Sequence, residues 1–584
     1  MFLLFPNMGH SFQSLLRIRE APLSMVEWKN EWVQAQPASK VWKNTLCAYA
    51  HKVMKHRVVQ EASTTQTVLW FNCALMAKKG QIIEVEIFDT ADKNRCVGKL
   101  EDGMAVFVEG PIAVGDTVKA RVTKTKKKFL QARLTEVIKF SDRRTEPRCK
   151  YFGVCGGCKW QHFDYSEQLR VKRKQVVDAL ERLGGFENPA VAECIPAEEK
   201  FGYRNKIDMD FTDQRYLTAD EMDIPAEELG KPIDFALGFH APGCFAKVID
   251  IDHCDLASEE MNLVVETVRL FFRDRKLPIY STFQPDGFLR NLVVRTGGAT
   301  GELMVNLITS MHDAALMNEL CTALQTALGD KLTTFVNGIS TRKNMFAFNE
   351  EEHVLCGEGF ITDRLGEYTY QISPNSFFQT NTAQAEVLYN EIVKQAGFHP
   401  PSPEGSGETG GSDPSEAREA SRMRGTDRRE GQTVYDLFCG TGSIALFASK
   451  HCGNVLGIEL VESAVADAQK NADAQGVQNC TFRQMDLMHF GKIREELEEF
   501  GLPDLVITDP PRAGMHPKAV KMLRELKPPV VIYVSCGPAS LARDGQLLCE
   551  DGLYKLVSCQ PVDMFPQTNH VESVARFELT ASGQ

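Results

Sequence analysis

The 584-residue sequence has no apolar run that approaches the roughly 18 residues of a membrane-spanning helix, so we expect no transmembrane segment. It also has too few cysteines for a disulfide scaffold, because the 17 present are mostly scattered singly and their number is odd. This usage is typical of a reducing compartment. We therefore expect a cytoplasmic protein that uses a few of its cysteines for metal binding or catalysis.

Positive charge is also scarce: the net charge of −12 argues against a generic nucleic-acid coat protein. A local basic footprint is still compatible with it, because electrostatic attraction depends on where the charges cluster. In residues 79–140, short strand-like runs alternate with turns, which predicts a small closed antiparallel barrel. Its last part is crowded with Lys119, Arg121, Lys124, Lys126, Lys127, Lys128 and Arg133. A charge run alone is usually a solvated hairpin, but a basic barrel in an acidic protein favours phosphate binding.

The middle of the chain alternates helical and extended patterns. Residues 164–183 predict a helix that Asp164 can cap and Gly184 can end. Its basic side is formed by Arg170, Lys172, Arg173 and Lys174. Residues 200–375 predict a mixed, largely antiparallel domain, and residues 382–395 predict a further helix.

Two segments carry no chemistry that we can assign. Residues 1–70 begin with the apolar run MFLLF but have no convincing secretory cleavage pattern, so we treat them as an N-terminal extension. Residues 400–431 are rich in Gly, Ser, Pro, Glu and Arg and lack apolar periodicity, which predicts a flexible insertion.

A group of closely spaced cysteines suggests a metal site. Cys149, Cys155 and Cys158 follow one another at six- and three-residue steps around a glycine turn, which suits thiolates that converge on one centre. A fourth ligand is needed, and Cys254 is the best candidate. Zinc also takes four thiolates, so an iron–sulfur cluster and zinc both remain open at this point.

The carboxyl-terminal region repeats one pattern, in which an apolar strand ends in a polar or catalytic residue. A strand through Phe438 leads into a glycine-bearing turn, and the strands that follow end near Glu459, Asp486, Asp509 and Cys536. A single acidic strand end is commonly a solvated turn residue. A series of them at one edge of a parallel sheet predicts a ligand site there.

The glycine turn at residues 439–442 lacks the features of a phosphate-binding loop. The GxGxxG fingerprint is absent and no phosphate-binding lysine follows the turn, which disfavours nicotinamide cofactors and nucleoside triphosphates. Glu459 at the next strand end can accept both hydroxyls of a ribose. S-adenosylmethionine, which has a ribose but no phosphate, fits better.

Six motifs together make a resemblance specific. In chain order they are FFQTN, DLFCGTG, GIE, DPPRAGMHP, YVSCGP and QPVDMFPQTNHVE. This order resembles the RNA uracil-5-methyltransferase family, and the cysteines resemble its iron–sulfur branch, which methylates a uridine in 23S-type ribosomal RNA. The resemblance implies a multi-domain α/β protein: a TRAM RNA-binding β-barrel at 75–140, a central mixed α+β iron–sulfur RNA-recognition domain at 141–375, and a Rossmann-like methyltransferase domain at 376–584.

The resemblance also implies roles for individual residues. Cys536 is the nucleophile and Glu572 the base. Positions that bind the cofactor S-adenosylmethionine or the target base are Gln379, Phe438, Ser443, Glu459, Asp486 and Asp509. A 4Fe-4S cluster is held by Cys149, Cys155, Cys158 and Cys254. The family often has Asn at the positions of Ser443 and Gly537, which are departures here.

These roles match the chemistry of the reaction. C5 of uracil is too weakly nucleophilic to attack a methyl sulfonium, but a thiolate that adds at C6 turns the base into an enolate with electron density on C5. A base must then remove the C5 proton so that the thiolate can leave. The uridine has to be flipped out of its helix or loop to reach the site.

Several alternatives remain open. Transfer RNA is an alternative to ribosomal RNA as the substrate. A non-catalytic RNA-binding assembly factor, an amino-group methyltransferase and an iron–sulfur redox protein are the rival functions, and the first two would not need Cys536. We expect a monomer.

Overall fold

The computed structural model of the protein describes residues 77–91, 95–281, 285–398, 431–489, 496–497 and 499–581. The predictions for the N-terminal extension and, except for its last residue, for the insertion at 400–431 lie outside these residues. The described residues belong to one compact unit. Among the helices that they form, none combines the length and the apolar character needed to cross a bilayer.

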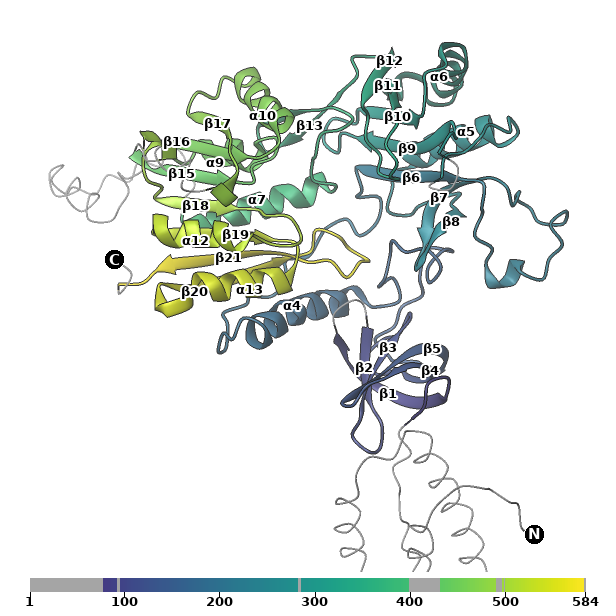
Figure 1. Ribbon diagram of the computed structural model, residues 1–584, viewed down its shortest axis with the longest axis horizontal. Coiled ribbons are helices and arrows are strands. Elements are labelled where there is room, and N and C mark those ends of the chain that lie inside the picture. The colour runs from purple at the N-terminus through teal and green to yellow at the C-terminus, as the bar shows by residue number, and fades with distance from the viewer. Residues whose placement is uncertain are drawn as a thin grey trace, which may run out of the picture. The chain divides into compact units, whose positions relative to one another are not determined.

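The predicted small barrel is present (Figure 1). Its strands close in the order β1-β2-β3-β5-β4. Their bounds are β1 Ile82–Ala91, β2 Arg95–Lys99, β3 Ala105–Glu109, β4 Thr117–Thr125 and β5 Phe129–Lys139. We expected an antiparallel barrel, and this prediction is wrong for one pair of strands, because β3 and β5 run parallel. An odd number of strands cannot close into a ring in which every neighbour runs in the opposite direction.

The central region contains a seven-stranded sheet in the order β12-β11-β10-β9-β6-β7-β8. All neighbouring strands are antiparallel except β10 and β11, as the sequence pattern predicts. The strands are β6 Lys206–Thr212, β7 Ala236–Ala241, β8 Cys244–Asp250, β9 Leu289–Thr296, β10 Leu303–Thr309, β11 Leu332–Ile339 and β12 Glu351–Cys356, and the helices are α5 Glu259–Arg273 and α6 Ala314–Leu328. Apolar residues of both helices share one core with the sheet.

The carboxyl-terminal sheet has the order β17-β16-β15-β18-β19-β21-β20. Its first five strands are parallel, and β21 is antiparallel to both β19 and β20. The strands are β15 Thr433–Leu437, β16 Asn454–Glu459, β17 Cys480–Gln484, β18 Leu505–Thr508, β19 Val530–Ser535, β20 Tyr554–Val562 and β21 Glu572–Leu579. This arrangement confirms the predicted Rossmann-like fold of the carboxyl-terminal region.

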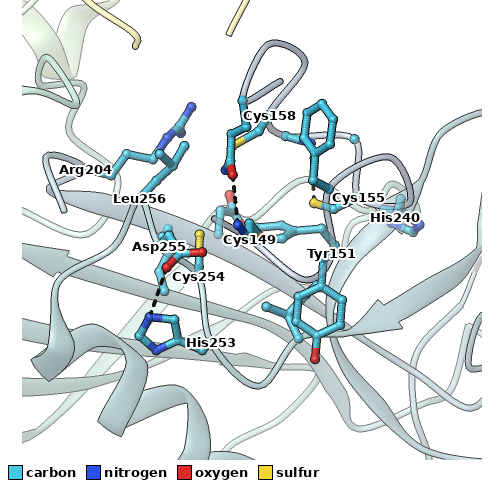
Figure 2. Close-up of a pocket in the computed structure, with 18 of the residues that line it drawn as sticks. Cys149, Tyr151, Cys155, Cys158, Arg204, His240, His253, Cys254, Asp255 and Leu256 are labelled. Carbon is cyan, nitrogen blue, oxygen red and sulfur yellow. Dashed lines mark hydrogen bonds and ion pairs between the residues drawn. The ribbon is translucent and has the colours of Figure 1, made fainter. Parts of the chain in front are cut away.

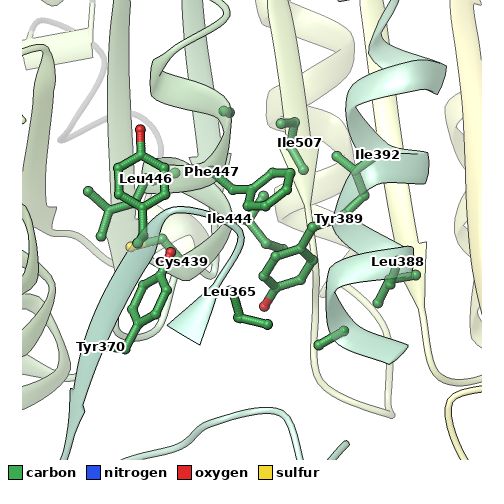
Figure 3. Packing of buried hydrophobic residues seen from close by; sticks show 14 of the residues in the cluster. Leu365, Tyr370, Leu388, Tyr389, Ile392, Cys439, Ile444, Leu446, Phe447 and Ile507 are labelled. Atoms are coloured by element: carbon green, nitrogen blue, oxygen red, sulfur yellow. The ribbon is translucent and has the colours of Figure 1, made fainter. Parts of the chain in front are cut away.

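Helices cover both faces of this sheet (Figure 1), because successive strand residues point to opposite faces. On the first face Val434, Ile507 and Ile532 pack with a helix that precedes the sheet in sequence, as Figure 3 shows for its Tyr389. The elements of this face are the hairpin β13 Ile361–Leu365 and β14 Tyr368–Ile372, and the helices α7 Thr382–Ala396, α9 Ser443–Ser449 and α10 Glu462–Ala474. The second face is covered by α4 Tyr165–Arg182, α12 Pro517–Leu526 and α13 Pro538–Leu548.

Two predicted helices are confirmed as α4 and α7. Asp164 caps α4 by accepting a hydrogen bond from the Ser166 N–H, and Asn381 caps α7 in the same way through Gln384. The remaining short elements are the 3₁₀ turns η1 Ala219–Glu221, η2 Gly329–Lys331, η4 Leu487–His489 and η5 Glu550–Gly552. Because α4 and the β13–β14 hairpin pack into the cores of the carboxyl-terminal sheet, elements from before residue 376 help to build the methyltransferase fold. The domain limits themselves stay predictions.

Candidate active site and cysteine cavity

The candidate site lies where the order of the carboxyl-terminal sheet reverses. From β15 the chain proceeds to β16 on one side, whereas β18 lies on the other side of β15. Open α/β sheets bind their ligands outside the carboxyl ends of the strands at such a point. Backbone contacts join the strand ends there: the Asp509 N–H donates to Leu437 O over 3.3 Å, and the Met485 N–H donates to Glu459 O over 2.9 Å.

Cys536 and Glu572 lie across from each other at this edge. Ser535, the last residue of β19, pairs with Ser573 of β21. Because the two strands are antiparallel, the next position along β19 is Cys536 and its neighbour across the gap is Glu572. The side chain of Glu572 is buried and that of Cys536 is half-buried. Reversal of β21 therefore brings a strand's amino end to an edge otherwise formed by carboxyl ends.

Burial and like charges set the protonation of this pair. Burial, together with the negative charges of Glu572 and Asp509, raises the pKa of the Cys536 thiol to about 11, and the cationic Arg512 opposes the rise. Burial and the charge of Asp509 raise the pKa of Glu572 well above its ordinary value, again against Arg512. Burial raises the pKa of Asp509 to about 7. Without RNA the site therefore holds Cys536 as a thiol at neutral pH, and burial disfavours the charged form of Glu572.

The turn after Cys536 is tied down by its own hydroxyl groups. The Gly537 N–H donates to Ser535 Oγ over 3.1 Å, and Ser540 Oγ donates to Gly537 O over 2.8 Å. A Cβ built at Gly537 would meet Ser540 Oγ at 2.8 Å. The glycine at this position, where the family often has Asn, is thus matched by a serine packed against the turn.

The glycine turn and Glu459 form one hydrogen-bonded unit. Phe438, Gly440 and Gly442 all have positive φ angles, which fold the chain tightly between β15 and α9. The Gly440 N–H donates to Glu459 Oε2 over 3.1 Å, and Glu459 Oε1 accepts from the N–H groups of Leu460 and the following residue over 2.7 and 3.0 Å. A Cβ built at Gly440 would meet nothing within 4 Å, so the outer side of the turn is open to a ligand.

Ser443 forms hydrogen bonds with two tyrosines. Its Oγ lies 2.9 Å from Tyr389 Oη of α7, and its carbonyl accepts from Tyr370 Oη of β14 over 3.2 Å. Figure 3 shows both tyrosines beside the first turn of α9. Ser443 is therefore coupled to α7 and β14, a partnership that the strand-end pattern does not reveal.

Asp486 and Gln379 lie at the margins of the site. Asp486 comes two residues after β17. Its carboxylate accepts a hydrogen bond from the Met488 N–H over 2.9 Å, which holds the pKa of the carboxyl below its ordinary value. The Gln379 carbonyl accepts from Asn205 Nδ2 over 2.8 Å. Asn381, two residues later, donates to Met564 O over 3.0 Å, so this segment adjoins the loop that leads to Glu572.

That loop, residues 563–571, is anchored by α4. Lys172 forms an ion pair with Asp563 in which both side chains are fully buried, and it also donates to Phe565 O over 3.0 Å. Tyr165 Oη donates to Asp563 Oδ2 over 3.0 Å. We predicted that Lys172 belongs to the basic side of α4, and this prediction is wrong. The side chain points inward to Asp563, an acidic partner that sequence spacing could not reveal.

The loop is also joined to the cysteine-bearing segment. Gln567, whose φ is +68°, exchanges hydrogen bonds with Gln168 of α4: its N–H donates to Gln168 Oε1 and its Oε1 accepts from Gln168 Nε2, each over 3.0 Å. Its carbonyl accepts from the N–H groups of Lys159 and Trp160 over 2.9 and 3.0 Å. Lys159 directly follows Cys158, so the cysteine segment is hydrogen-bonded to the loop before Glu572.

The four predicted cysteine ligands border one cavity of about 490 Å³ (Figure 2). Burial raises the pKa of Cys149 to about 11 and that of Cys158 to about 12, and the pKa of Cys155 and of Cys254 is also raised by burial. The Gly157 N–H donates to Cys155 Sγ over 3.4 Å. In the described ranges, no three or more Cys, His, Asp or Glu side chains lie close enough together to hold a metal ion.

Comparisons with known proteins address the carboxyl-terminal and amino-terminal parts of the fold. A family model described as tRNA (uracil-5-)-methyltransferase matches residues 422–578, and a TRAM domain model matches residues 77–135. A protein of Chlorobaculum tepidum described as an uncharacterised RNA methyltransferase is 46% identical over 501 residues, covering 86% of this chain and 97% of the relative. A second one, from Bacteroides thetaiotaomicron, is 35% identical and covers 84% of this chain and 100% of the relative.

A solved structure is similar over most of the chain. The tRNA (uracil-54, C5)-methyltransferase of Pyrococcus abyssi, in complex with S-adenosyl-L-homocysteine, superposes with a TM-score of 0.59 at 27% sequence identity. The match covers 85% of this chain and 100% of the archaeal protein.

Proposed function

Because this chain belongs to the family of S-adenosylmethionine-dependent RNA uracil-5-methyltransferases, we propose that it methylates C5 of one uridine in 23S-type ribosomal RNA through a covalent bond to Cys536. The observation that carries the proposal is the cross-strand juxtaposition of Cys536 and Glu572 beside Asp509. An amino-group methyltransferase has no use for a thiol opposite a carboxyl group. A binding factor has no use for either.

Cys536 and Glu572 divide the chemistry. The Cys536 thiolate adds to C6 of the flipped uracil, which forms the Sγ–C6 bond and moves electron density to C5. S-adenosylmethionine supplies the methyl group that C5 then carries. Glu572 takes the proton from C5, the electrons of the C5–H bond form the C5–C6 double bond, and the Sγ–C6 bond breaks.

Both groups act in their ionised forms, which burial disfavours. A thiol with a pKa of about 11 is almost wholly protonated at pH 7, and burial raises the pKa of Glu572 as well. Arg512 favours ionisation of both groups, so it is the residue that prepares the site. Asp509, with a pKa of about 7, suits hydrogen bonding to the uracil edge, since it can donate or accept with little cost.

The donor pocket is formed by the glycine turn and the strand ends around it. We assign Glu459 to the ribose hydroxyls and Asp486 to the adenine side, with Phe438 and Ser443 on the turn itself. The open side of the turn at Gly440 leaves room for this ligand. Gln379 closes the pocket from the segment before α7.

We propose that Cys149, Cys155, Cys158 and Cys254 hold a 4Fe-4S cluster. Support comes from the cavity that the four cysteines share and from the Gly157 N–H at Cys155 Sγ, since hydrogen bonds to the sulfur atoms tune cluster thiolates. When bound, the cluster would tie the Cys254 segment to residues 149–158. Because Lys159 and Trp160 hold Gln567, it would also brace the loop before Glu572, so its role is structural.

The cluster is tested by anaerobic reconstitution with iron and sulfide. The wild-type protein should gain visible absorbance and four irons per chain, and Cys254→Ser should not. Proteolysis of the 563–571 loop should be faster in Cys254→Ser than in Cys244→Ser, which alters a cysteine of β8 outside the set. Zinc bound in place of iron would contradict the assignment, and so would equal proteolysis of the two variants.

The substrate is tested by methyl transfer from labelled S-adenosylmethionine to a panel of RNAs. Purified protein is incubated with unmodified 23S-type ribosomal RNA fragments and transfer RNA transcripts, and nuclease digests are examined for 5-methyluridine. We expect the modified nucleoside in a ribosomal fragment, and none with Cys536→Ala. Transfer RNA is the second candidate, because a structurally similar relative acts on it. RNA that is bound but left unmethylated would favour the assembly factor.

A further inference from the structure

A buried arginine fixes the loop between β11 and β12. Arg290 of β9 is 1% exposed, stacks on Tyr280 at 3.6 Å, and donates to the carbonyls of Arg342 and Asn344 over 2.8 and 2.7 Å. Asn291, the next residue of β9, donates to Met345 O over 3.2 Å. Burying a guanidinium group costs free energy. Because Arg290 spends its hydrogen bonds on the backbone of a surface loop, we infer that this loop has to keep one conformation.

The loop presents an aromatic ring and positive charge to solvent. Phe346 is 76% exposed, the largest exposed fraction among the large hydrophobic side chains of the described residues. Arg342 and Lys343 are exposed beside it, and Arg342 forms an ion pair with Glu350 over 3.5 Å, so Lys343 supplies the positive charge that the loop offers to a ligand. Arg342 is steadied over the ring of Phe348 at 3.7 Å. A rigid loop with an exposed ring and cations suits a nucleobase and its phosphate.

The loop is connected to the segment that precedes α7. The Asn349 N–H donates to Asn375 Oδ1, and Asn375 Nδ2 donates to Asn349 O, each over 2.9 Å. Arg295, a second buried arginine of β9, donates to Ser376 O in the same segment. Gln379, which we assign to the donor pocket, follows three residues later. One strand thus orients both the Phe346 loop and a segment of the proposed active site.

We propose that Phe346 stacks on an unpaired RNA base close to the target uridine, while Lys343 contacts the phosphate backbone. The proposal rests on the proposed function, since it takes an RNA substrate with bases displaced around the modified position. A stacked neighbour stabilises the strand after the uridine has left its own stack. Phe346 is therefore a specificity-determining residue that binds substrate away from the reacting atoms.

The test compares RNA binding and single-turnover methylation in three variants, using the ribosomal fragment or transfer RNA transcript that the wild type binds best. Phe346→Ala should weaken RNA binding roughly 5- to 100-fold, with binding of S-adenosylmethionine unchanged. Phe346→Trp should retain the affinity. Leu270→Ala removes a 48% exposed side chain from α5 and serves as the control that should change nothing.

An abasic scan around the target uridine identifies the stacked base. At one position, removal of the base should make Phe346→Ala and the wild type bind equally, whereas other abasic positions should preserve the difference. Lys343→Met should reduce the salt dependence of binding by about one phosphate contact, and Phe346→Ala should not. Unchanged affinity of Phe346→Ala, or a difference preserved at every position, would overturn the proposal and reassign the ring to a protein partner. Absence of 5-methyluridine in the wild type would instead count against the proposed function.

Discussion

The buried pair Lys172–Asp563 allows a quantitative prediction. Both side chains have no exposed surface, Lys172 donates to Phe565 O, and Tyr165 donates to the second Asp563 oxygen. Lys172→Met leaves a buried carboxylate that has lost its cation and keeps two neutral donors, the Tyr165 hydroxyl and the Phe565 N–H, a change that costs about 3–5 kcal/mol. At about 2–4 °C of melting temperature per kcal/mol, the methyltransferase part should melt roughly 6–20 °C lower.

The double variant Lys172→Met/Asp563→Leu separates the pair from its surroundings. Because removal of both charges leaves no unpaired ion, it should recover at least about 1 kcal/mol relative to the sum of the single variants. The assay is thermal unfolding followed by fluorescence, with Arg182→Met as the control, since Arg182 is 70% exposed and its ion pair contributes little. Equal melting of Lys172→Met and the control, or strict additivity in the double variant, would refute the reasoning.

The remaining predictions concern the catalytic edge. In protein without RNA, Glu572→Gln should speed alkylation of Cys536 at pH 9, because loss of the carboxylate charge lowers the thiol pKa and raises the thiolate fraction. Arg512→Met should slow the alkylation, because loss of the positive charge raises the thiol pKa. Mass spectrometry of the modified peptide measures both rates. The reverse order would mean that these charges do not act on the thiol. Gly442→Ala should lose affinity for S-adenosylmethionine by calorimetry and at least about 1 kcal/mol of stability, because φ is +79° and the new Cβ would meet the Phe482 ring at 2.8 Å. Unaltered affinity would show that the turn does not border the donor.

Local patterns predicted the elements well where a single strand or helix carries its own signal. Apolar runs located β15, β16, β18 and β19, and the capping residue Asp164 located the start of α4. The rule that parallel strands end at one edge then grouped Glu459, Asp509 and Cys536 correctly.

Partnerships across long sequence separations could not be predicted from such patterns. Asp563 lies 391 residues from Lys172, so a lysine that spacing assigns to a solvated side is in fact buried. The insertion of β21 between β19 and β20 brings Glu572 beside Cys536, and only the family resemblance indicated that role before the pairing was known. The parallel contact of β3 with β5 follows from the number of strands, which no single strand reveals.

Covalent trapping tests the role of Cys536 most directly. The protein is incubated with S-adenosylmethionine and ribosomal RNA in which 5-fluorouridine replaces uridine, and complexes that survive denaturation are resolved by electrophoresis. Fluorine at C5 cannot leave as a proton, so the methylated adduct should stall with Sγ bound to C6. We predict a stable RNA–protein band that requires the methyl donor and disappears in Cys536→Ala. A protein that methylates unsubstituted RNA yet forms no such band, or a band that persists in Cys536→Ala, would contradict covalent catalysis at this residue.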